Sequence, residues 1–342
     1  MASSVGAAGT PPVSSVAFTT IGTWQADSVT AAQVEAAMSD LRRHEERAAV
    51  RTSVLTLVVV VGSTDEANET LDVVRHLGAR HPSRTLVLVL DEEDTGESRL
   101  DASVAVCAID RGGRAVAVEE MVLECRGPAR YHLDSLVLPF TVPDLPVAVW
   151  LPTSLPSRGD PLLEAADRVV VDTRVVGYQP DALSRLHALT RRVAVTDLSW
   201  SRLKPWRRLL AGLFEGHIYR PFLRDVHHLE VTGHAGPRHL FAGWVMSRLD
   251  LPRAVVHLGD AEHLSVKLVA SHEGRWGRFD VERKGDERVI DASVEIEGGP
   301  SFEQKVQIGE AWPSRALADA LAHMGHNQTY EAALQAALGL LR

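Results

Sequence analysis

The sequence predicts an α/β protein, with an N-terminal Rossmann-like, mostly parallel sheet that has helices on both faces, followed by a C-terminal α+β part with an antiparallel meander. Two observations support this prediction. Through the first two-thirds of the chain, apolar runs of strand length alternate with helical segments, which is typical of parallel sheets. In the final third, short strands follow one another and are separated by glycine-containing turns.

A helix and then a βαβ unit are expected at the start of the α/β part. A helix is expected over residues 30–47, where Val34, Met38 and Leu41 make one apolar stripe among charges. The strand over residues 53–62 is apolar on both faces and rich in β-branched residues, as in a central strand covered by helices on either side. The elements expected next are a helix over 66–78, a strand over 85–91, a hairpin, a helix over 131–138, strands over 147–151 and 168–172, a helix over 181–190 and a strand over 192–197.

The hairpin contains both cysteines of the chain, Cys107 and Cys125, a number that fits a reducing compartment. With a two-residue turn at Gly112-Gly113, Cys107 faces Val118 and Cys125 lies opposite Leu100. The two thiols are then too far apart along the ladder for a disulfide, whose Cα atoms lie about 4.4–6.8 Å apart. We therefore expect buried, inert thiols.

The final third changes in character. The elements expected there are a strand over 228–232, a helix over 238–249, strands over 264–271, 276–282, 288–295 and 302–307, and helices over 314–325 and 329–341. Polar and apolar residues alternate along these strands, so one face of the sheet should be wet, and the last helices could cover the other face.

Three domain-level segments are expected. Residues 1–29 begin with Ser, Ala, Gly and Pro and read as a mobile tail. An N-terminal α/β domain over 30–160 and a C-terminal domain over 161–342 then meet at the least regular stretch, residues 152–161.

Composition excludes several classes of protein. The 342 residues are 45% hydrophobic and 24% charged, as in ordinary globular chains, and the formal net charge of −9 argues against nucleic-acid binding. No apolar run approaches the roughly 20 residues of a membrane-spanning helix, and the N-terminus lacks the pattern of a secretory signal. We therefore expect a cytoplasmic protein without a membrane partner.

The sequence DLSWSRLKPWRRLLAGLF at residues 197–214, which we call the Trp–Arg segment, joins a strand end to a helix. Pro205 suits the first turn of that helix, and apolar residues recur after it at helical spacing. Trp and Arg dominate binding hot spots, because they bury a large area and offer directional hydrogen bonds. A partner surface is one interpretation. The other, which the sequence leaves open, packs both tryptophans in the core and places the arginines at its rim.

A ligand crevice is possible at two places. Ser63 and Thr64 follow Gly62 between a strand and a helix, where backbone N–H groups favour an anion, and Asp144 and Trp150 flank a strand where open α/β sheets often bind ligands. No GxGxxG or Walker sequence accompanies them. The simpler interpretation is that Ser63 or Thr64 caps the helix, and that the turn at Asp144 directs the chain into the next strand.

No motif specifies catalysis, a cofactor or a metal. The densest histidine group lacks any HExxH or cysteine-bearing zinc spacing, so surface histidines are expected; it comprises His227, His228, Glu230, His234 and His239. No GxSxG elbow occurs either.

The Trp–Arg segment, VLPFTVPDLPVAVWLP at residues 137–152 and DRVVVDTR at residues 167–174 together resemble the OpcA family of glucose-6-phosphate dehydrogenase assembly proteins. The resemblance runs from about Arg51 onward and departs from the family at Lys204, where a small polar residue often stands. An ammonium cannot cap the helix, so Ser201 or water would have to do so.

The resemblance implies a non-catalytic assembly factor and allosteric activator that binds glucose-6-phosphate dehydrogenase, favours its active oligomer and thereby supports the oxidative pentose phosphate pathway. The expected contact residues are Trp200, Arg202, Trp206 and Arg207. The alternative is an α/β enzyme or sugar-phosphate sensor that uses the Gly62 turn or the crevice near Asp144. The sequence does not predict the oligomeric state of the chain itself.

Overall fold

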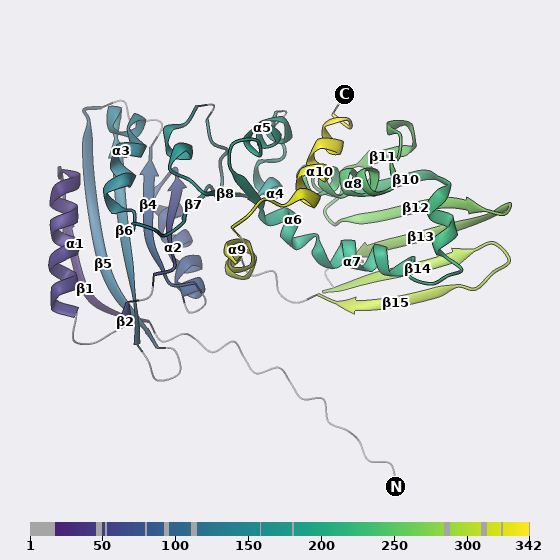
Figure 1. Ribbon diagram of the computed structural model, residues 1–342, viewed down its shortest axis with the longest axis horizontal. Coiled ribbons are helices and arrows are strands. Elements are labelled where there is room, and N and C mark those ends of the chain that lie inside the picture. The colour runs from purple at the N-terminus through teal and green to yellow at the C-terminus, as the bar shows by residue number, and fades with distance from the viewer. Residues whose placement is uncertain are drawn as a thin grey trace, which may run out of the picture.

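The computed structural model describes residues 18–45, 50–51, 53–78, 81–91, 96–110, 115–157, 159–179, 181–283, 288–308, 313–322 and 324–341. Two sheets lie at opposite ends of an elongated molecule, and several helices fill the space between them (Figure 1). The predicted α/β class, with a mostly parallel sheet followed by a mostly antiparallel one, is confirmed.

The first sheet runs in the order β1-β5-β6-β4-β3-β7-β8-β9, and β2 pairs with β6. All neighbours from β6 to β9 are parallel, whereas β5 is antiparallel to both β1 and β6. Its strands are β1 (Phe18–Ala26), β2 (Val50–Arg51), β3 (Leu55–Val61), β4 (Ser83–Leu90), β5 (Arg99–Asp110), β6 (Ala115–Arg126), β7 (Val147–Trp150), β8 (Arg168–Val171) and β9 (Ala194–Asp197).

The central strand β3 is buried along its whole length because helices cover both faces of the sheet. Leu57 and Val59 face a core that includes residues of α2 (Thr64–Gly78) and α9 (Pro313–Leu321). Val58 and Val60 face the other core, which α1 (Ala31–Glu45) and α5 (Ala182–Leu189) help to form. This alternation follows from the two-residue period of a strand.

Two adjacent glutamates of β6 bond the first two helices to opposite faces of the sheet. Glu119 accepts a hydrogen bond from Arg42 of α1 at 2.6 Å and one from Arg84 of β4 at 2.6 Å. Glu120 points the other way and pairs with Arg75 of α2 at 2.9 Å. Burial raises the pKa of Glu119, but the two guanidinium groups outweigh it, so its pKa lies below the usual value.

The second sheet has the order β11-β10-β12-β13-β14-β15, with a parallel β10–β11 pair and antiparallel pairs elsewhere. Its strands are β10 (Val226–Thr232), β11 (Val256–Gly259), β12 (Ser265–His272), β13 (Arg275–Arg283), β14 (Val289–Ile296) and β15 (Phe302–Gln307). Buried and exposed residues alternate along β10 and β12, so one face is wet, as predicted.

Helices α7 (Lys204–Leu213) and α8 (Ala235–Leu249) cover the dry face of the second sheet. We expected the C-terminal helices in this role, and that prediction is wrong. Helix α9 contacts α2 and α6 (Leu198–Arg202), and α10 (Gln328–Leu338) contacts α8 and α5. The C-terminal helices therefore return to the first sheet and to the middle of the molecule (Figure 1).

The hairpin prediction is confirmed in register. Cys107 pairs with Val118, Leu100 pairs with Cys125, and both thiols are free and buried. Burial raises the pKa of Cys125 to about 12, so this thiol stays protonated and unreactive at neutral pH.

Three other predictions need correction. Within the expected tail over residues 1–29, residues 18–26 form β1, which pairs with the distant β5; residues 1–17 lie outside the described residues. The helix expected over 131–138 shortens to α3 (Leu133–Val137), which gives way to a 3-10 turn containing Pro139. The first sheet also continues through β8 and β9, beyond the expected division at residue 160.

Candidate functional site

The Trp–Arg segment begins at a carboxylate cluster on the carboxyl ends of β8 and β9. Asp197 ends β9 and caps α6, since its carboxylate accepts hydrogen bonds from the backbone N–H of Ser199 at 2.9 Å and of Thr173 at 3.1 Å. The Thr173 hydroxyl adds a third bond at 2.7 Å. Asp172, which directly follows β8, accepts from the Ser199 hydroxyl at 2.7 Å and pairs with Arg202.

Asp197 is fully buried, and burial raises its pKa to about 7. The nearby Asp172 carboxylate contributes to this raised value, and the bonds from Thr173 and Ser199 act against it. The cluster therefore holds two carboxyl groups with different environments, one inside the protein and one neutralised by Arg202 near its surface.

Both tryptophans of the segment lie in the interior. Trp200 is 5% exposed and Trp206 is 7% exposed. The Arg207 guanidinium lies 3.4 Å from the centre of the Trp200 ring and donates to the Trp200 carbonyl oxygen at 2.8 Å. Tyr330 of α10 packs against the same ring, with the ring centres 5.7 Å apart. The segment therefore joins the core of the first sheet to α10.

This geometry favours the core interpretation of the Trp–Arg segment over direct contact through its aromatic rings. Burial lowers the pKa of Arg207 to about 10, which still leaves it charged at neutral pH, stacked on Trp200. The two expected arginines are both half-buried, and each is engaged within the chain: Arg202 pairs with Asp172, and Arg207 stacks on Trp200. Helix α7 starts after Leu203 without a side-chain cap, so Ser201 does not cap it.

The Gly62 turn lies at the carboxyl edge of the first sheet, where the strand order reverses between β3 and β7. In sheets of this kind a bound anion commonly accepts from a backbone N–H at this position. Here the Gly62 N–H donates to the carboxylate of Glu66 at 2.9 Å, and Thr153 donates to the same carboxylate at 3.4 Å. The Glu66 carboxylate therefore occupies the position that a bound anion would take.

The other expected crevice residues do not come together at this edge. Ser63 caps α2 by accepting from the Glu66 N–H at 3.2 Å, and Thr64 is the first residue of that helix. Trp150 ends β7 with its ring buried, whereas Asp144 precedes β7 and is exposed at the opposite edge. Asp144 and Gly62 therefore cannot share one crevice, because the length of a parallel strand separates them.

A different cavity, of about 660 Å³, lies beside the Trp–Arg segment. Arg202, Lys204 and Trp206 line it, together with residues from β13, β15, α8 and α9. We call it the basic cavity because of its five cationic side chains, which are Arg174, Arg202, Lys204, Arg283 and Arg315.

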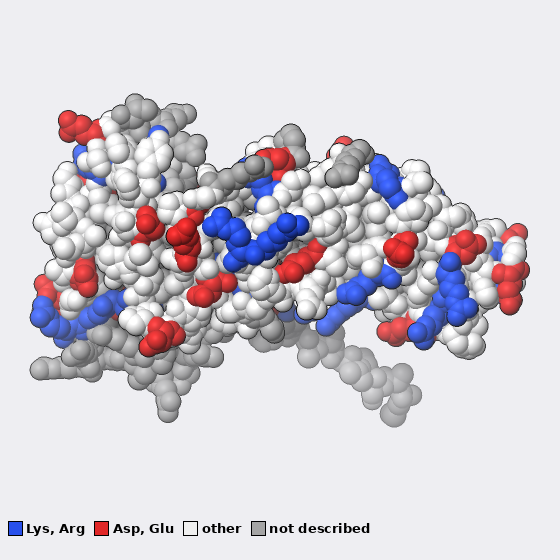
Figure 2. All heavy atoms as spheres, turned by 45° about the horizontal axis from the view of Figure 1, so that its top comes forward, with Lys and Arg blue, Asp and Glu red and all other residues white. Residues whose placement is uncertain are grey.

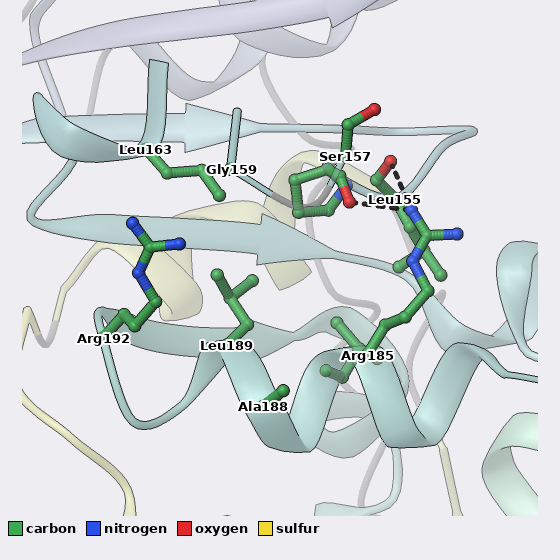
Figure 3. Close-up of a pocket in the computed structure, with 10 residues that line it drawn as sticks. Leu155, Ser157, Gly159, Leu163, Arg185, Ala188, Leu189 and Arg192 are labelled. Carbon is green, nitrogen blue, oxygen red and sulfur yellow. Dashed lines mark hydrogen bonds between the residues drawn. The ribbon is translucent and has the colours of Figure 1, made fainter. Parts of the chain in front are cut away.

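A smaller cavity of about 120 Å³ lies between α5 and the loop around Leu155. Figure 3 shows Arg185 turned to the loop, where it donates to the carbonyl oxygens of Leu155 at 3.3 Å and Pro156 at 2.7 Å. Leu163 and Leu189 form much of the remaining wall. Arg185 thus serves to hold the loop, and this cavity has the character of a packing gap.

One face of the molecule carries mixed charge. On the face drawn in Figure 2, Lys and Arg side chains are interspersed with Asp and Glu. Within the described ranges, no helix is long and apolar enough to span a bilayer. The same residues place no group of three or more His, Cys, Asp or Glu side chains where it could hold a metal ion.

Two family models match the chain, and both describe a subunit of glucose-6-phosphate dehydrogenase. Residues 74–189 match the N-terminal domain of that subunit, and residues 193–334 match its C-terminal domain. The chain belongs to the OpcA family. A similar curated protein is "Putative OxPP cycle protein OpcA" of Synechocystis sp. (strain ATCC 27184 / PCC 6803 / Kazusa), which is 26% identical over 182 residues. That match covers 51% of this chain and 38% of the relative.

The boundary between the two family models lies just before β9 and the Trp–Arg segment. The basic cavity therefore falls at the junction of the two matched domains: Arg174 lies in the first, and Arg202, Lys204, Arg283 and Arg315 lie in the second. Sequence reasoning missed this cavity because its residues come from separate elements and form no local motif. The basic cluster at the start of α7 was its one visible signal.

Proposed function

We propose that this protein binds glucose-6-phosphate dehydrogenase and favours its assembled, active oligomer without itself catalysing a reaction. The observation that carries the proposal is the match of the chain to two domains described as parts of a subunit of that enzyme. Such a protein acts by linkage, because preferential binding to the active assembly shifts the population toward it; about 1.4 kcal/mol of differential affinity changes the ratio tenfold.

The Gly62 turn also supports a non-catalytic role. The Glu66 carboxylate accepts from the Gly62 N–H, and this negative charge would repel a phosphate group entering the same position. A Rossmann-like sheet that fills its own anion position is better suited to present surfaces than to hold a nucleotide. From the match to the subunit domains, we further propose that the protein acts in the cytoplasm and supports the oxidative pentose phosphate pathway.

The contact surface that we propose is the outer side of the Trp–Arg segment. Trp200, Trp206 and Arg207 hold this side in place from within, whereas Arg202 and Arg208 carry charge at or near the exterior. Replacement of the buried tryptophans would disturb the core, so it cannot test the surface. Exposed Arg208 is the better probe.

The decisive experiment is the rate of the cognate glucose-6-phosphate dehydrogenase against substrate concentration, with and without this protein, together with light scattering of the mixture. We expect a lower KM or a higher kcat, accompanied by a larger complex. No kinetic change and no complex would overturn the proposal and favour an independent enzyme or sensor.

A charge reversal locates the contact within the same experiment. Arg208→Glu should weaken the complex while leaving the fold intact, because the side chain is exposed. Arg191→Glu, at an exposed position beyond the end of α5, is the matched control and should bind normally. Equal binding by both variants would exclude this surface.

A further inference from the structure

The basic cavity draws its charges from several elements that are distant in the chain. Arg174 belongs to α4 (Thr173–Val176), Lys204 begins α7, Arg283 ends β13 and Arg315 belongs to α9. Figure 1 shows α9 between the two sheets and the end of β15 at the edge of the second sheet that faces it, and residues of both elements line the cavity. The cavity is therefore walled by parts of both halves of the molecule.

The charge of this cavity is opposite to that of the chain. Among the residues that the structure describes, five Lys and Arg side chains and two carboxyl residues, Glu262 and Asp319, line the cavity, whereas the chain as a whole has a formal net charge of −9. Asp172 neutralises Arg202, and Arg174, Lys204 and Arg315 still outnumber the two acids. Like charges gathered in a concave site focus a positive potential there.

Two helix starts add to this potential. Helices α7 and α8 both begin at the cavity wall, and neither has a side-chain cap at its N-terminus. The first N–H groups of a helix carry a partial positive charge, which stabilises a nearby anion. Pro205 and Pro237, in the first turns of these helices, line the cavity and bring the two helix ends to it.

The size of the cavity indicates a small molecule. A volume of about 660 Å³ lies within the range of roughly 300–1,000 Å³ that is usual for ligand pockets. Leu264, Val306 and Ile308 supply apolar wall on the side of the second sheet. A cavity with cationic and apolar walls can bind an organic phosphate. The phosphoryl group would pair with the guanidinium and ammonium groups, and the carbon skeleton would pack against the apolar wall.

We propose that the basic cavity binds a small phosphorylated metabolite. The site lies on the chain itself and does not rest on the proposed assembly role. A ligand held there contacts both halves of the molecule at once, so its binding stabilises their arrangement.

The test uses the full chain without any partner. Inorganic pyrophosphate and glucose 6-phosphate are titrated by calorimetry at constant ionic strength, with glucose as the uncharged comparison. We expect saturable binding of one equivalent of at least one phosphate compound, a higher Tm in its presence and no binding of glucose. The proposal would be overturned if neither phosphate compound bound saturably.

Two matched double variants locate the site. Lys204→Ala with Arg315→Ala removes two exposed cations that line the cavity and should weaken binding at least tenfold. Arg191→Ala with Arg224→Ala removes two exposed cations outside it and should leave binding unchanged. Circular dichroism of each variant establishes folding, and Arg174→Gln serves as a second cavity variant if the first is unstable.

Three results would contradict the inference. Equal weakening by both double variants would show general charge attraction. Unchanged binding in folded cavity variants would place the phosphate elsewhere. If the chain ignores both phosphate compounds and the cavity variants lose affinity for glucose-6-phosphate dehydrogenase, the cavity receives an acidic segment of that partner instead. A different outcome concerns the assembly role alone: if the natural chain binds a phosphate compound but does not activate the dehydrogenase, the assembly role is contradicted and the inference stands.

Discussion

Asp197 of the Trp–Arg segment holds two helices in place, although burial of its charged carboxylate is unfavourable. Its carboxylate organises α6 and the start of α4 through bonds from Ser199 and Thr173, and no other described acidic residue is as fully buried. Burial in a low-dielectric interior favours the neutral carboxyl group and raises its pKa, whereas the hydrogen bonds favour the charged carboxylate and lower its pKa. The fold keeps the acid because its oxygens satisfy three donors at once.

This raised pKa predicts a pH dependence of stability. The folded pKa of Asp197 is about 7 and the ordinary value is 3.8, so the folded state holds the proton more tightly than the unfolded state. The resulting stabilisation is complete below the ordinary value and is lost as pH rises through about 7. The stability of Asp197→Asn, which keeps an acceptor oxygen but cannot titrate, should not show this decrease.

The measurement is urea unfolding of the natural chain and of Asp197→Asn between pH 4 and pH 8. The free energy of unfolding of the natural chain minus that of the variant should fall with rising pH across this window. Parallel curves for the two proteins would show that Asp197 titrates as it does in the unfolded chain.

At the scale of elements, the packing of α8 on α10 depends on a close approach of two helices. A Cβ atom added at Gly243 of α8 would lie 2.2 Å from the carbonyl oxygen of Ala333 in α10. Because that oxygen belongs to the backbone, one helix has to move. Gly212 of α7 has nothing within 4 Å of the same position and is exposed.

Gly243→Ala should therefore destabilise the protein by about 1–3 kcal/mol through overpacking. Gly212→Ala, the control in another helix, should stabilise it by about 0.5–1 kcal/mol, because alanine has the higher helix propensity. Chemical denaturation of both variants measures the difference. A neutral or stabilising effect of Gly243→Ala would mean that α8 and α10 are not packed as closely as described.

Elements with a strong local pattern could be predicted from the sequence, and those defined by distant partners could not. The Gly112-Gly113 pair in the sequence predicted a register by counting, and the strands on either side have that register at Cys107 and Cys125. Strand β1 has a weaker apolar pattern and owes its place to β5, which pairs with it across more than 70 positions. The side chains of the basic cavity converge only through tertiary packing.

At the scale of the whole molecule, one apolar core connects the two sheets. Val169 and Val195 of the first sheet belong to the same buried cluster as Phe279 and Val281 of the second. Trp200 and Trp206 lie within this cluster between them. The Trp–Arg segment is therefore part of the connection between the two halves, which explains why its aromatic rings are not available to a partner.

A shared core predicts that the two halves unfold together. Differential scanning calorimetry of the full chain should give one transition, with a calorimetric enthalpy close to the van't Hoff enthalpy. Two resolved transitions would show that the halves are energetically independent despite the continuous cluster.

The return of α9 to the first sheet also has a consequence for biosynthesis. Buried residues of α9, among them Leu317 and Leu321, complete an apolar cluster whose other buried members all lie at or before Leu198. The ribosome adds Leu317 119 residues after Leu198, which takes roughly 6–24 s at about 5–20 residues per second. Throughout that interval the nascent first sheet exposes part of an apolar face, so general chaperones should engage the growing chain at α2 and release it once α9 emerges.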